Sequence, residues 1–259
     1  MATSLKNKWV LITGASSGFG AAAARAFAAE GANIVIGARR LDRLEQVAAD
    51  CKKAGAPQAH FHALDVSKTA SVEQFVAFAK TKTNAIDILI NNAGGAHGLD
   101  KIADLKDEDM EAMYQTNVMG LLRVTRAVLP LIPKIPGSAI LNVGSYAGYE
   151  VYEGGGAYSG AKSAERFISR TLRLELCGTN IRVCSIDPGL AETEFSIVRF
   201  KGDKEKAKKP YVGTEPLHAE DIAEAMVWVA TRPHYMCVDE MLIKATDQAS
   251  IQKVNRRTQ

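Results

Sequence analysis

Short runs of β-branched and aliphatic residues alternate with helix-like stretches along the whole chain. The run 9–13 (WVLIT) is short and apolar at nearly every position, whereas 18–31 is rich in alanine and ends on a glycine. A strand that is apolar at successive positions is buried on both faces, so helices must cover both sides of its sheet. Strands that are separated by helices pair in parallel. The alternation therefore predicts a doubly wound α/β fold.

The pattern continues to the C-terminus. Strands are expected over 9–13, 33–38, 59–66, 86–94, 138–145, 181–187 and 238–245, and helices over 18–31, 40–55, 69–82, 107–132, 157–176 and 219–232. Residues 188–218 show no regular pattern. Because no linker rich in Pro, Gly or Ser divides the chain, we expect a single domain over residues 1–259, with about seven parallel strands and helices on both faces.

The composition is that of an ordinary globular protein and excludes several classes. Apolar residues make up 47% and charged residues 24% of the chain, and the net charge is +3. This mild charge argues against a nucleic-acid-binding protein. The N-terminus has no apolar segment of signal-peptide length and no stretch approaches ~18 consecutive apolar residues, so we expect a cytoplasmic protein without a membrane partner. The four scattered cysteines indicate reduced thiols rather than disulfides or a metal site.

A glycine-rich loop, TGASSGFG, follows the first predicted strand. Its three glycines stand where the strand gives way to an alanine-rich helix. Small residues let the backbone approach a pyrophosphate closely, and the helix N-terminus offers unpaired N–H groups and a partial positive charge. The two serines add hydroxyl donors. The residues predicted to bind a dinucleotide here, rather than to form only a structural turn, are Gly14, Ser16, Ser17, Gly18, Phe19 and Gly20.

The end of the second predicted strand indicates which dinucleotide is bound. An acidic residue there would bind the ribose 2′-hydroxyl of NAD, but the segment IGARR has Ala38 at that position, followed by Arg39 and Arg40. Guanidinium groups match the 2′-phosphate that distinguishes NADP. The alternative is that the two arginines only cap a surface loop. Asp42 lies a few residues further on and is expected either to open the next helix or to pair with an arginine, so NADP(H) is the predicted cofactor.

Residues at two other strand ends are predicted to complete the cofactor site. Asp65 and Val66 end the third strand and are expected to flank the adenine ring. Ala93 and Gly94, in the NNAG segment after the fourth strand, would lie beside the cofactor. Asn91 begins that segment and is expected either to contact the cofactor or to tie neighbouring strands together.

Four tyrosines lie within residues 145–162, and one of them has a chemical partner. Tyr158 and Lys162 are four residues apart on a predicted helix, so their side chains share a face one turn apart. A free phenol has a pKa of about 10, and a nearby ammonium favours its phenolate. Such a phenol can exchange a proton with an alcohol or carbonyl oxygen while hydride moves on carbon. Ser145 ends the fifth predicted strand, where its hydroxyl could hold the reacting oxygen.

Together, these motifs resemble the short-chain dehydrogenase/reductase family. TGASSGFG, NNAG, YQTNVMG, YSGAK and DPG occur in the family's order over residues 9–190. The resemblance implies a single Rossmann domain in which Tyr158 donates or accepts the proton, while Lys162 promotes its phenolate and binds the nicotinamide ribose. Ser145 would position the substrate oxygen, and Asn117 would hold a water in a proton relay to Lys162. The resemblance assigns the nicotinamide end of the cofactor to Pro188, Gly189, Leu190 and Thr193.

The irregular segment 188–218 is where such enzymes build their substrate pocket. Its stretch GLAETEFSIVRFKG is similar to the branch of the family that oxidises 3-hydroxy acids, including serine and allo-threonine, with NADP and reduces small semialdehydes in reverse. Arg199 is a candidate partner for a substrate carboxylate through bidentate hydrogen bonds. The alternative is a structural salt bridge between Arg199 and Glu192 or Glu194.

Three residues between the predicted serine and tyrosine of the site are expected to form the pocket wall. Tyr149 stands where some relatives carry an arginine that can dock an anionic group, and Glu150 and Tyr152 follow it. Glu150 would repel a carboxylate or a sulfonate but could suit an amine. We therefore expect this wall to set the specificity.

The predicted function is that of an NADP-dependent oxidoreductase acting on a small 3-hydroxy acid. A broader NADPH-dependent carbonyl reductase for aldehydes and ketones is the alternative, and the intact tetrad argues against a non-catalytic NADP-binding protein. The resemblance also implies a homotetramer, whose interfaces the long helices 107–132 and 157–176 could supply.

Overall fold

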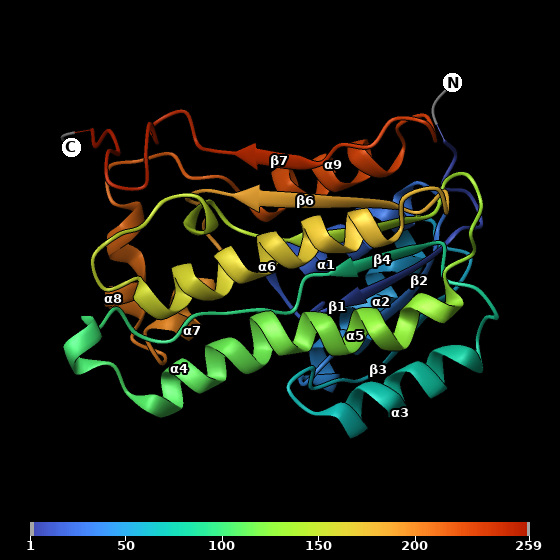
Figure 1. The fold of residues 1–259 in the computed structure, drawn as a ribbon, viewed down its shortest axis with the longest axis horizontal. Helices are drawn as coiled ribbons and strands as arrows, with labels where there is room; N and C mark the ends of the chain where they lie inside the picture. Colours follow the sequence, from blue (N-terminus) through green and yellow to red (C-terminus); the bar gives the residue numbers. More distant parts are fainter. Residues whose placement is uncertain (1–2, 258–259) are drawn as a thin grey trace.

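One sheet runs through the computed structural model, which describes residues 3–257 (Figure 1). Its strands are β1 (Trp9–Thr13), β2 (Asn33–Ala38), β3 (Ala59–Ala63), β4 (Ile88–Asn91), β5 (Ala139–Val143), β6 (Arg182–Pro188) and β7 (Glu240–Ile243). Their order is β3-β2-β1-β4-β5-β6-β7, and every neighbouring pair is parallel. The predicted doubly wound fold with seven parallel strands is confirmed.

Helices cover both faces of this sheet, as Figure 1 shows. The helices behind the sheet in that view are α1 (Gly18–Ala29), α2 (Leu41–Ala54) and α9 (Ala219–Ala230), and those in front of it are α3 (Thr69–Lys80), α5 (Gly120–Val128) and α6 (Gly156–Glu175). Helix α1 contacts α2 and α9 on one side, while α3 packs beside α5 on the other.

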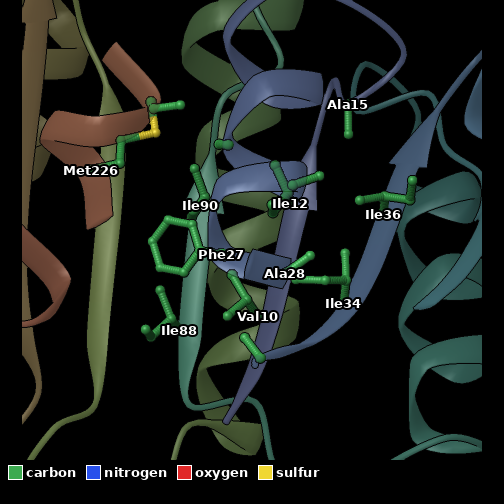
Figure 2. Close-up of a cluster of buried hydrophobic side chains, with 14 of the residues drawn as sticks. Val10, Ile12, Ala15, Phe27, Ala28, Ile34, Ile36, Ile88, Ile90 and Met226 are labelled. Carbon is green, nitrogen blue, oxygen red and sulfur yellow. The ribbon is translucent and has the colours of Figure 1, made fainter. Parts of the chain in front are cut away.

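Each central strand supplies side chains to both layers of the core. Val10 and Ile12 of β1 belong to a buried cluster with Phe27 of α1 and Met226 of α9 (Figure 2). Leu11, between them, points to the opposite face and joins the cluster beneath α3, α5 and α6. Burial of a side chain of this size contributes about 2 kcal/mol. This two-sided burial explains why the strand sequence is apolar at successive positions.

The order in which the chain builds the sheet opens a crevice at the carboxyl ends of β1 and β4. The chain builds the sheet outward from β1 through β2 to β3, then returns to the other side of β1 and builds β4 to β7. The loops that follow β1 and β4 therefore leave in opposite directions, which opens a crevice at their carboxyl ends. In Figure 1 the strands β6 and β7 point toward the end of the molecule where α7 (Phe195–Arg199) and α8 (Lys204–Lys208) lie.

The predicted helix 107–132 contains a local widening that its sequence pattern did not predict. Helix α4 (Asp107–Tyr114) passes into a π-helical turn, η2 (Gln115–Met119), before α5 begins. The Asn117 side chain, in this turn, donates to the carbonyl of Met113 in α4 at 2.7 Å. Among the described residues, the helices are too short or too polar to cross a lipid bilayer.

Candidate active site

A cavity of about 1170 Å³ lies at the carboxyl edge of the sheet. Its wall is formed by the loop after β1, the ends of β2 to β6, parts of α4 and α6, the segment around α7 and the C-terminal segment 248–256. The predicted site residues that line it are Gly14, Ser16, Ser17, Gly18, Phe19, Arg39, Arg40, Asp65, Val66, Ala93, Gly94, Ser145, Tyr152, Tyr158, Lys162, Pro188, Gly189, Leu190, Thr193 and Arg199. Gly20, Asn91, Asn117, Tyr149 and Glu150 are not part of this wall.

The glycine loop brings two backbone segments close together. Gly14 has a φ of +68°, and a Cβ on it would lie 2.7 Å from Ala93 Cα. Gly20 serves packing instead, because a Cβ there would lie 2.7 Å from the Gly14 carbonyl oxygen. Ser17 caps α1 in an extended conformation without a side-chain capping bond. The first-turn N–H groups of α1 therefore remain available to an anion.

Two arginines follow β2, and they differ in their partners. Arg39 is exposed and makes no hydrogen bond or ion pair within residues 3–257, and it lines the cavity. Arg40 donates to Ser16 Oγ at 3.0 Å, to Ser17 Oγ at 2.7 Å and to Glu194 Oε2 at 2.9 Å. The guanidinium of Arg40 thus ties the glycine loop to the segment after β6.

Glu194 also pairs with Arg43, a residue for which the sequence analysis assigned no role. Although partial burial acts to raise the pKa of Glu194, hydrogen bonds from Arg43, Arg40 and Ser17 lower it to about 2. Arg43 stands in the first turn of α2, on the side that Glu194 reaches. Its position three residues beyond Arg40 was the sequence signal for a second cation at this end of the cavity.

Ser145, Tyr158 and Lys162 lie in the wall of the same cavity. Ser145 follows β5 and accepts a hydrogen bond from the Ala147 amide at 3.1 Å. Tyr158 is 8% exposed and its ring lies 5.5 Å from that of Phe195. The spacing on α6 therefore brings the phenol, the ammonium and the end of β5 to one place, as the sequence predicted.

The Lys162 ammonium is held by two acceptors. Its Nζ donates to the Val143 carbonyl at 2.9 Å and to Glu165 Oε2 at 2.6 Å. Burial acts to lower the pKa of Lys162, but the carboxylate of Glu165 and the phenol of Tyr158 raise it above its ordinary value. Glu165 was missed in the sequence, although its position three residues after Lys162 put it on the same helix face.

Asn117 lies behind the cavity rather than in its wall. Its side chain accepts from the Gly95 amide at 3.1 Å and donates to the Gly95 carbonyl at 2.9 Å. A Cβ on Gly94 would lie 2.6 Å from Asn117 Oδ1 and 3.6 Å from Lys162 Nζ. Asn117 and Lys162 therefore flank the same glycine, and the missing side chain of Gly94 keeps the space between them open.

Asn91 ties strands together, which was one of the two roles expected for it. Its Nδ2 donates to Asn142 Oδ1 of β5 and to Thr125 Oγ1 of α5, both at 2.9 Å. The Asn91 side chain is buried between β4, β5 and α5 and does not line the cavity, so its contact with a cofactor stays a prediction. Its neighbour Asn92 lines the cavity instead and donates to the Thr13 carbonyl at 2.9 Å.

Tyr149 and Glu150 turn away from the cavity, which corrects their predicted place in the pocket wall. A 3₁₀ turn over Tyr146–Gly148 directs the chain toward β7 and the C-terminal segment. The Tyr149 hydroxyl is shared between Asp187 Oδ2, at 3.0 Å, and Glu240 Oε2, at 2.9 Å. Glu150 Oε2 accepts from the Ile251 amide at 3.0 Å.

Arg199 reaches the cavity from α7 without a carboxylate partner among the described residues. Its Nη2 donates to Tyr152 Oη at 2.6 Å, and its guanidinium carbon lies 5.0 Å from the Tyr158 ring centre. The Nε atom is buried and has no hydrogen-bond partner. The alternative of a salt bridge to Glu192 or Glu194 is wrong, because Glu194 pairs with Arg40 and Arg43 and Glu192 has no ion pair in this part of the chain.

Two other predictions concern the cysteines and metal binding. The cysteines Cys51, Cys177, Cys184 and Cys237 are all free thiols. Within residues 3–257, no group of three or more His, Cys, Asp and Glu side chains has a spacing that could hold a metal ion.

Comparison with known proteins finds similarity along nearly the whole chain. The short chain dehydrogenase family matches residues 8–204. An NADP-dependent 3-hydroxy acid dehydrogenase of Schizosaccharomyces pombe is 41% identical over 254 residues, which cover 98% of each chain. A serine 3-dehydrogenase of Agrobacterium fabrum is 38% identical and covers 93% of this chain and 94% of its own.

Solved structures give the same result. The closed form of a serine dehydrogenase complexed with NADP⁺ superposes with a TM-score of 0.88 at 38% identity, covering 97% of this chain and all of the other. An alcohol dehydrogenase of Thermococcus sibiricus complexed with 5-hydroxy-NADP superposes with a TM-score of 0.82 at 30% identity, covering 94% and 98%. By its fold, the order of its motifs and the extent of these matches, the chain belongs to the short-chain dehydrogenase family of oxidoreductases.

Proposed function

We propose that this protein transfers hydride between NADP(H) and the hydroxyl-bearing carbon of a small 3-hydroxy acid, such as serine, allo-threonine or a 3-hydroxypropionate-like acid. In the reverse direction it reduces the corresponding semialdehyde. One observation carries the proposal: a single cavity joins Tyr158, Lys162 and Ser145 to the glycine loop and to the arginines after β2. The names and bound cofactor of the relatives described above support the same choice of cofactor and substrate class.

The residues that line the cavity suit the successive parts of NADP(H). Gly14 and the open first turn of α1 suit a pyrophosphate, and the unpaired guanidinium of Arg39 suits a 2′-phosphate. Asp65 and Val66 would flank the adenine, while Pro188 to Leu190 and Thr193 would hold the nicotinamide end. Bound NADP(H) would supply the hydride donor or acceptor beside the substrate carbon.

Tyr158 is the proposed acid and base of the reaction. During oxidation its phenolate takes the proton of the substrate hydroxyl, and during reduction its phenol returns a proton to the carbonyl oxygen. The Ser145 hydroxyl, in the same cavity wall, holds that oxygen. The Lys162 ammonium favours the phenolate of Tyr158, and the N–H that is not used by Val143 or Glu165 is free to bind a cofactor hydroxyl.

Asn117 is proposed to support the proton supply to Lys162. Its side chain is fixed by Gly95 and Met113, and the π-helical turn that contains it lies behind Gly94, on the side where Lys162 Nζ approaches. A water held there by the turn would connect Lys162 to solvent, as the family resemblance implies.

Arg199 and Tyr152 are the proposed binding site for the substrate carboxylate. Arg199 lines the cavity, lies beside the Tyr158 ring and lacks an anionic partner among the described residues, so a substrate carboxylate would pair with its guanidinium. The tyrosine hydroxyl orients the guanidinium. Glu150, which the sequence placed in this wall, is turned away from the cavity and does not oppose an acidic substrate.

The substrate class can be tested with a panel of L-serine, D-serine, 3-hydroxypropionate, 3-hydroxyisobutyrate and simple alcohols, each with NADP⁺ and with NAD⁺. We expect kcat/KM to be highest for a 3-hydroxy acid with NADP⁺. If 3-hydroxy acids are inert but aldehydes or ketones without a carboxylate are reduced by NADPH, the protein is a broader carbonyl reductase. If nothing in either panel turns over, the proposed function is wrong.

We further propose a homotetramer in the cytoplasm. Large apolar side chains are exposed on α4 to α6, among them Leu122 (41%), Phe167 (61%) and Leu174 (78%). Where exposed apolar side chains form a contiguous patch they mark protein interfaces, and we propose that these side chains form one. Free thiols at all four cysteines suit a reducing compartment. Light scattering after size-exclusion chromatography should give about four times the chain mass of 27.9 kDa, and a monomeric mass would refute the assembly.

A further inference from the structure

A buried ion pair stands directly behind the proposed proton-transfer site. Glu165 Oε2 lies 2.6 Å from Lys162 Nζ, and their side chains are only 3% and 7% exposed. The two residues are one helical turn apart on α6. The ammonium has three N–H donors, of which the carboxylate and the Val143 carbonyl use two. Glu165 therefore helps to fix where the third N–H points.

The charges around Glu165 are few. Lys162 is its ion-pair partner, and the buried carboxyl of Asp187 on β6 is the second acidic group that acts on both members of the pair. Tyr158, on the same helix, acts on Lys162. The strand β4, the turn η2 and the helix α5 place no charged side chain at the small cavity that Glu165 lines. The balance of charge beside Tyr158 is thus set by Lys162, Glu165 and Asp187, together with Arg199, whose guanidinium carbon lies 5.0 Å from the centre of its ring.

That small cavity measures about 10 Å³, close to the space that one water molecule needs. Asn91 and Asn117 line it together with Glu165. The Asn91 Oδ1 atom is buried and has no hydrogen-bond partner among the described residues. A water there would satisfy this oxygen and give Glu165 a proton-exchange partner on the side away from Lys162.

Given the proposed function, we propose that Glu165 is a positioning residue of the reaction: its carboxylate holds the Lys162 ammonium, and its protonation state sets how much positive charge Tyr158 experiences. With Glu165 ionised, the pair is nearly neutral and the phenolate of Tyr158 gains little. With Glu165 protonated, the full charge of Lys162 favours the phenolate. The carboxyl of Glu165 exchanges its proton with solvent, so this proton is neither consumed nor released by the hydride transfer itself.

Burial acts on the titration of Glu165. It raises the pKa of the Glu165 carboxyl above its ordinary value, against the opposing effect of the Lys162 ammonium. The carboxyl therefore takes up its proton at a higher pH than an exposed glutamate does.

The test is the pH dependence of kcat in Glu165→Gln, measured in both directions with saturating cofactor and the best substrate of the panel. Glutamine keeps the shape and an acceptor oxygen but removes the negative charge. We expect the rising limb of oxidation and the falling limb of reduction to move to lower pH together, by about one pH unit. Glu165→Asp keeps the charge with a shorter reach, so its limbs should stay in place while kcat falls.

Glu175→Gln is the matched control, because it is the same change on an exposed position of the same helix. It should leave kcat and both limbs unchanged. A Glu165→Gln enzyme with lower kcat but an unchanged pH profile would assign Glu165 a structural role only and overturn the proposal. An inactive wild-type protein would refute the proposed function instead.

A second measurement does not depend on the variant's folding or on turnover. In the wild-type protein labelled with ¹³C at its glutamate carboxyls, one resonance, absent from the spectrum of Glu165→Gln, should titrate above the ordinary value of about 4.3. If no glutamate titrates above that value, Glu165 cannot act as proposed.

Discussion

Glu194 and Arg40 join the segment after β6 to the end of β2 through an ion pair of 2.9 Å. The same carboxylate pairs with Arg43, and Arg40 also binds the hydroxyls of Ser16 and Ser17. A carboxylate thus occupies the cationic end of the cavity, where the proposed cofactor would place its 2′-phosphate. The two anions must compete for the same guanidinium groups, or share them.

Removing this carboxylate should strengthen NADP⁺ binding. For Glu194→Gln we expect the dissociation constant of NADP⁺ to fall several-fold while that of NAD⁺ stays the same, since partly exposed ion pairs of this kind are worth about 1 kcal/mol or less. Calorimetric titration of both cofactors measures the effect. Glu192→Gln, an exposed neighbour without an ion pair, is the control. Weaker NADP⁺ binding in Glu194→Gln would mean that the carboxylate supports the site rather than competes for it.

Arg39 should determine the preference for NADP⁺ over NAD⁺. It is the arginine after β2 that has no partner within residues 3–257, so its guanidinium is free for a phosphate. In Arg39→Ala we expect kcat/KM with NADP⁺ to fall about tenfold or more, because a charge-assisted hydrogen bond contributes about 1.5–3 kcal/mol. The value with NAD⁺ should not change. A native enzyme that prefers NAD⁺ would contradict the assignment of these arginines.

Arg199 should bind the carboxylate of the substrate and not the reacting hydroxyl. In Arg199→Met we expect KM for a 3-hydroxy acid to rise about 10- to 100-fold, since charge-assisted hydrogen bonds are lost while the apolar contacts to the Tyr158 and Phe195 rings are retained. For simple alcohols, which carry no carboxylate, KM should change little. An equal rise of KM for both substrate types would indicate that Arg199 supports the cavity wall instead.

Glu240 should make the protein more stable at neutral than at acidic pH. Burial acts to raise the pKa of Glu240, but hydrogen bonds from Arg170, Arg166 and Tyr149 lower it to about 2. A carboxyl with a lowered pKa stabilises the fold above its unfolded value of about 4.3, and this contribution is lost as the pH falls toward 2.

The corresponding variant is Glu240→Gln, followed by thermal unfolding. At pH 7 its Tm should lie a few degrees below that of the wild type, and the difference should shrink as the pH falls through 4 to 2.5. Glu175→Gln, whose carboxylate forms no ion pair within the described chain, provides the comparison. A difference that is independent of pH would show that the charge of Glu240 does not contribute.

Local sequence patterns were sufficient to predict the sheet and part of the cavity wall. The apolar run of β1, with Val10 and Ile12 facing one layer and Leu11 the other, already required helices on both sides. Once the strands are parallel, their carboxyl ends meet at one edge, so Ser145 and Tyr158 had to come together there.

The direction of the chain after Ser145 could not be predicted in the same way. Gly148 lies so close to α6 that a Cβ on it would be 2.9 Å from the Lys162 carbonyl oxygen. This tertiary contact fixes the 3₁₀ turn and sends Tyr149 toward Asp187 and Glu240. The π-helical turn at Asn117 depends in the same way on contacts with Gly95, far away in the sequence. The predictions that were wrong concerned side chains whose direction such contacts decide.

The central claim is that the Tyr158 hydroxyl exchanges the proton with the substrate oxygen, and Tyr158→Phe tests it most directly. We predict that single-turnover NADPH oxidation with the best substrate falls by about 10²–10⁴-fold, while NADPH binding, measured by fluorescence, is unchanged. Tyr235→Phe, at a surface position that is 79% exposed, should behave as the wild type. Turnover in Tyr158→Phe within threefold of the wild-type rate would contradict the account.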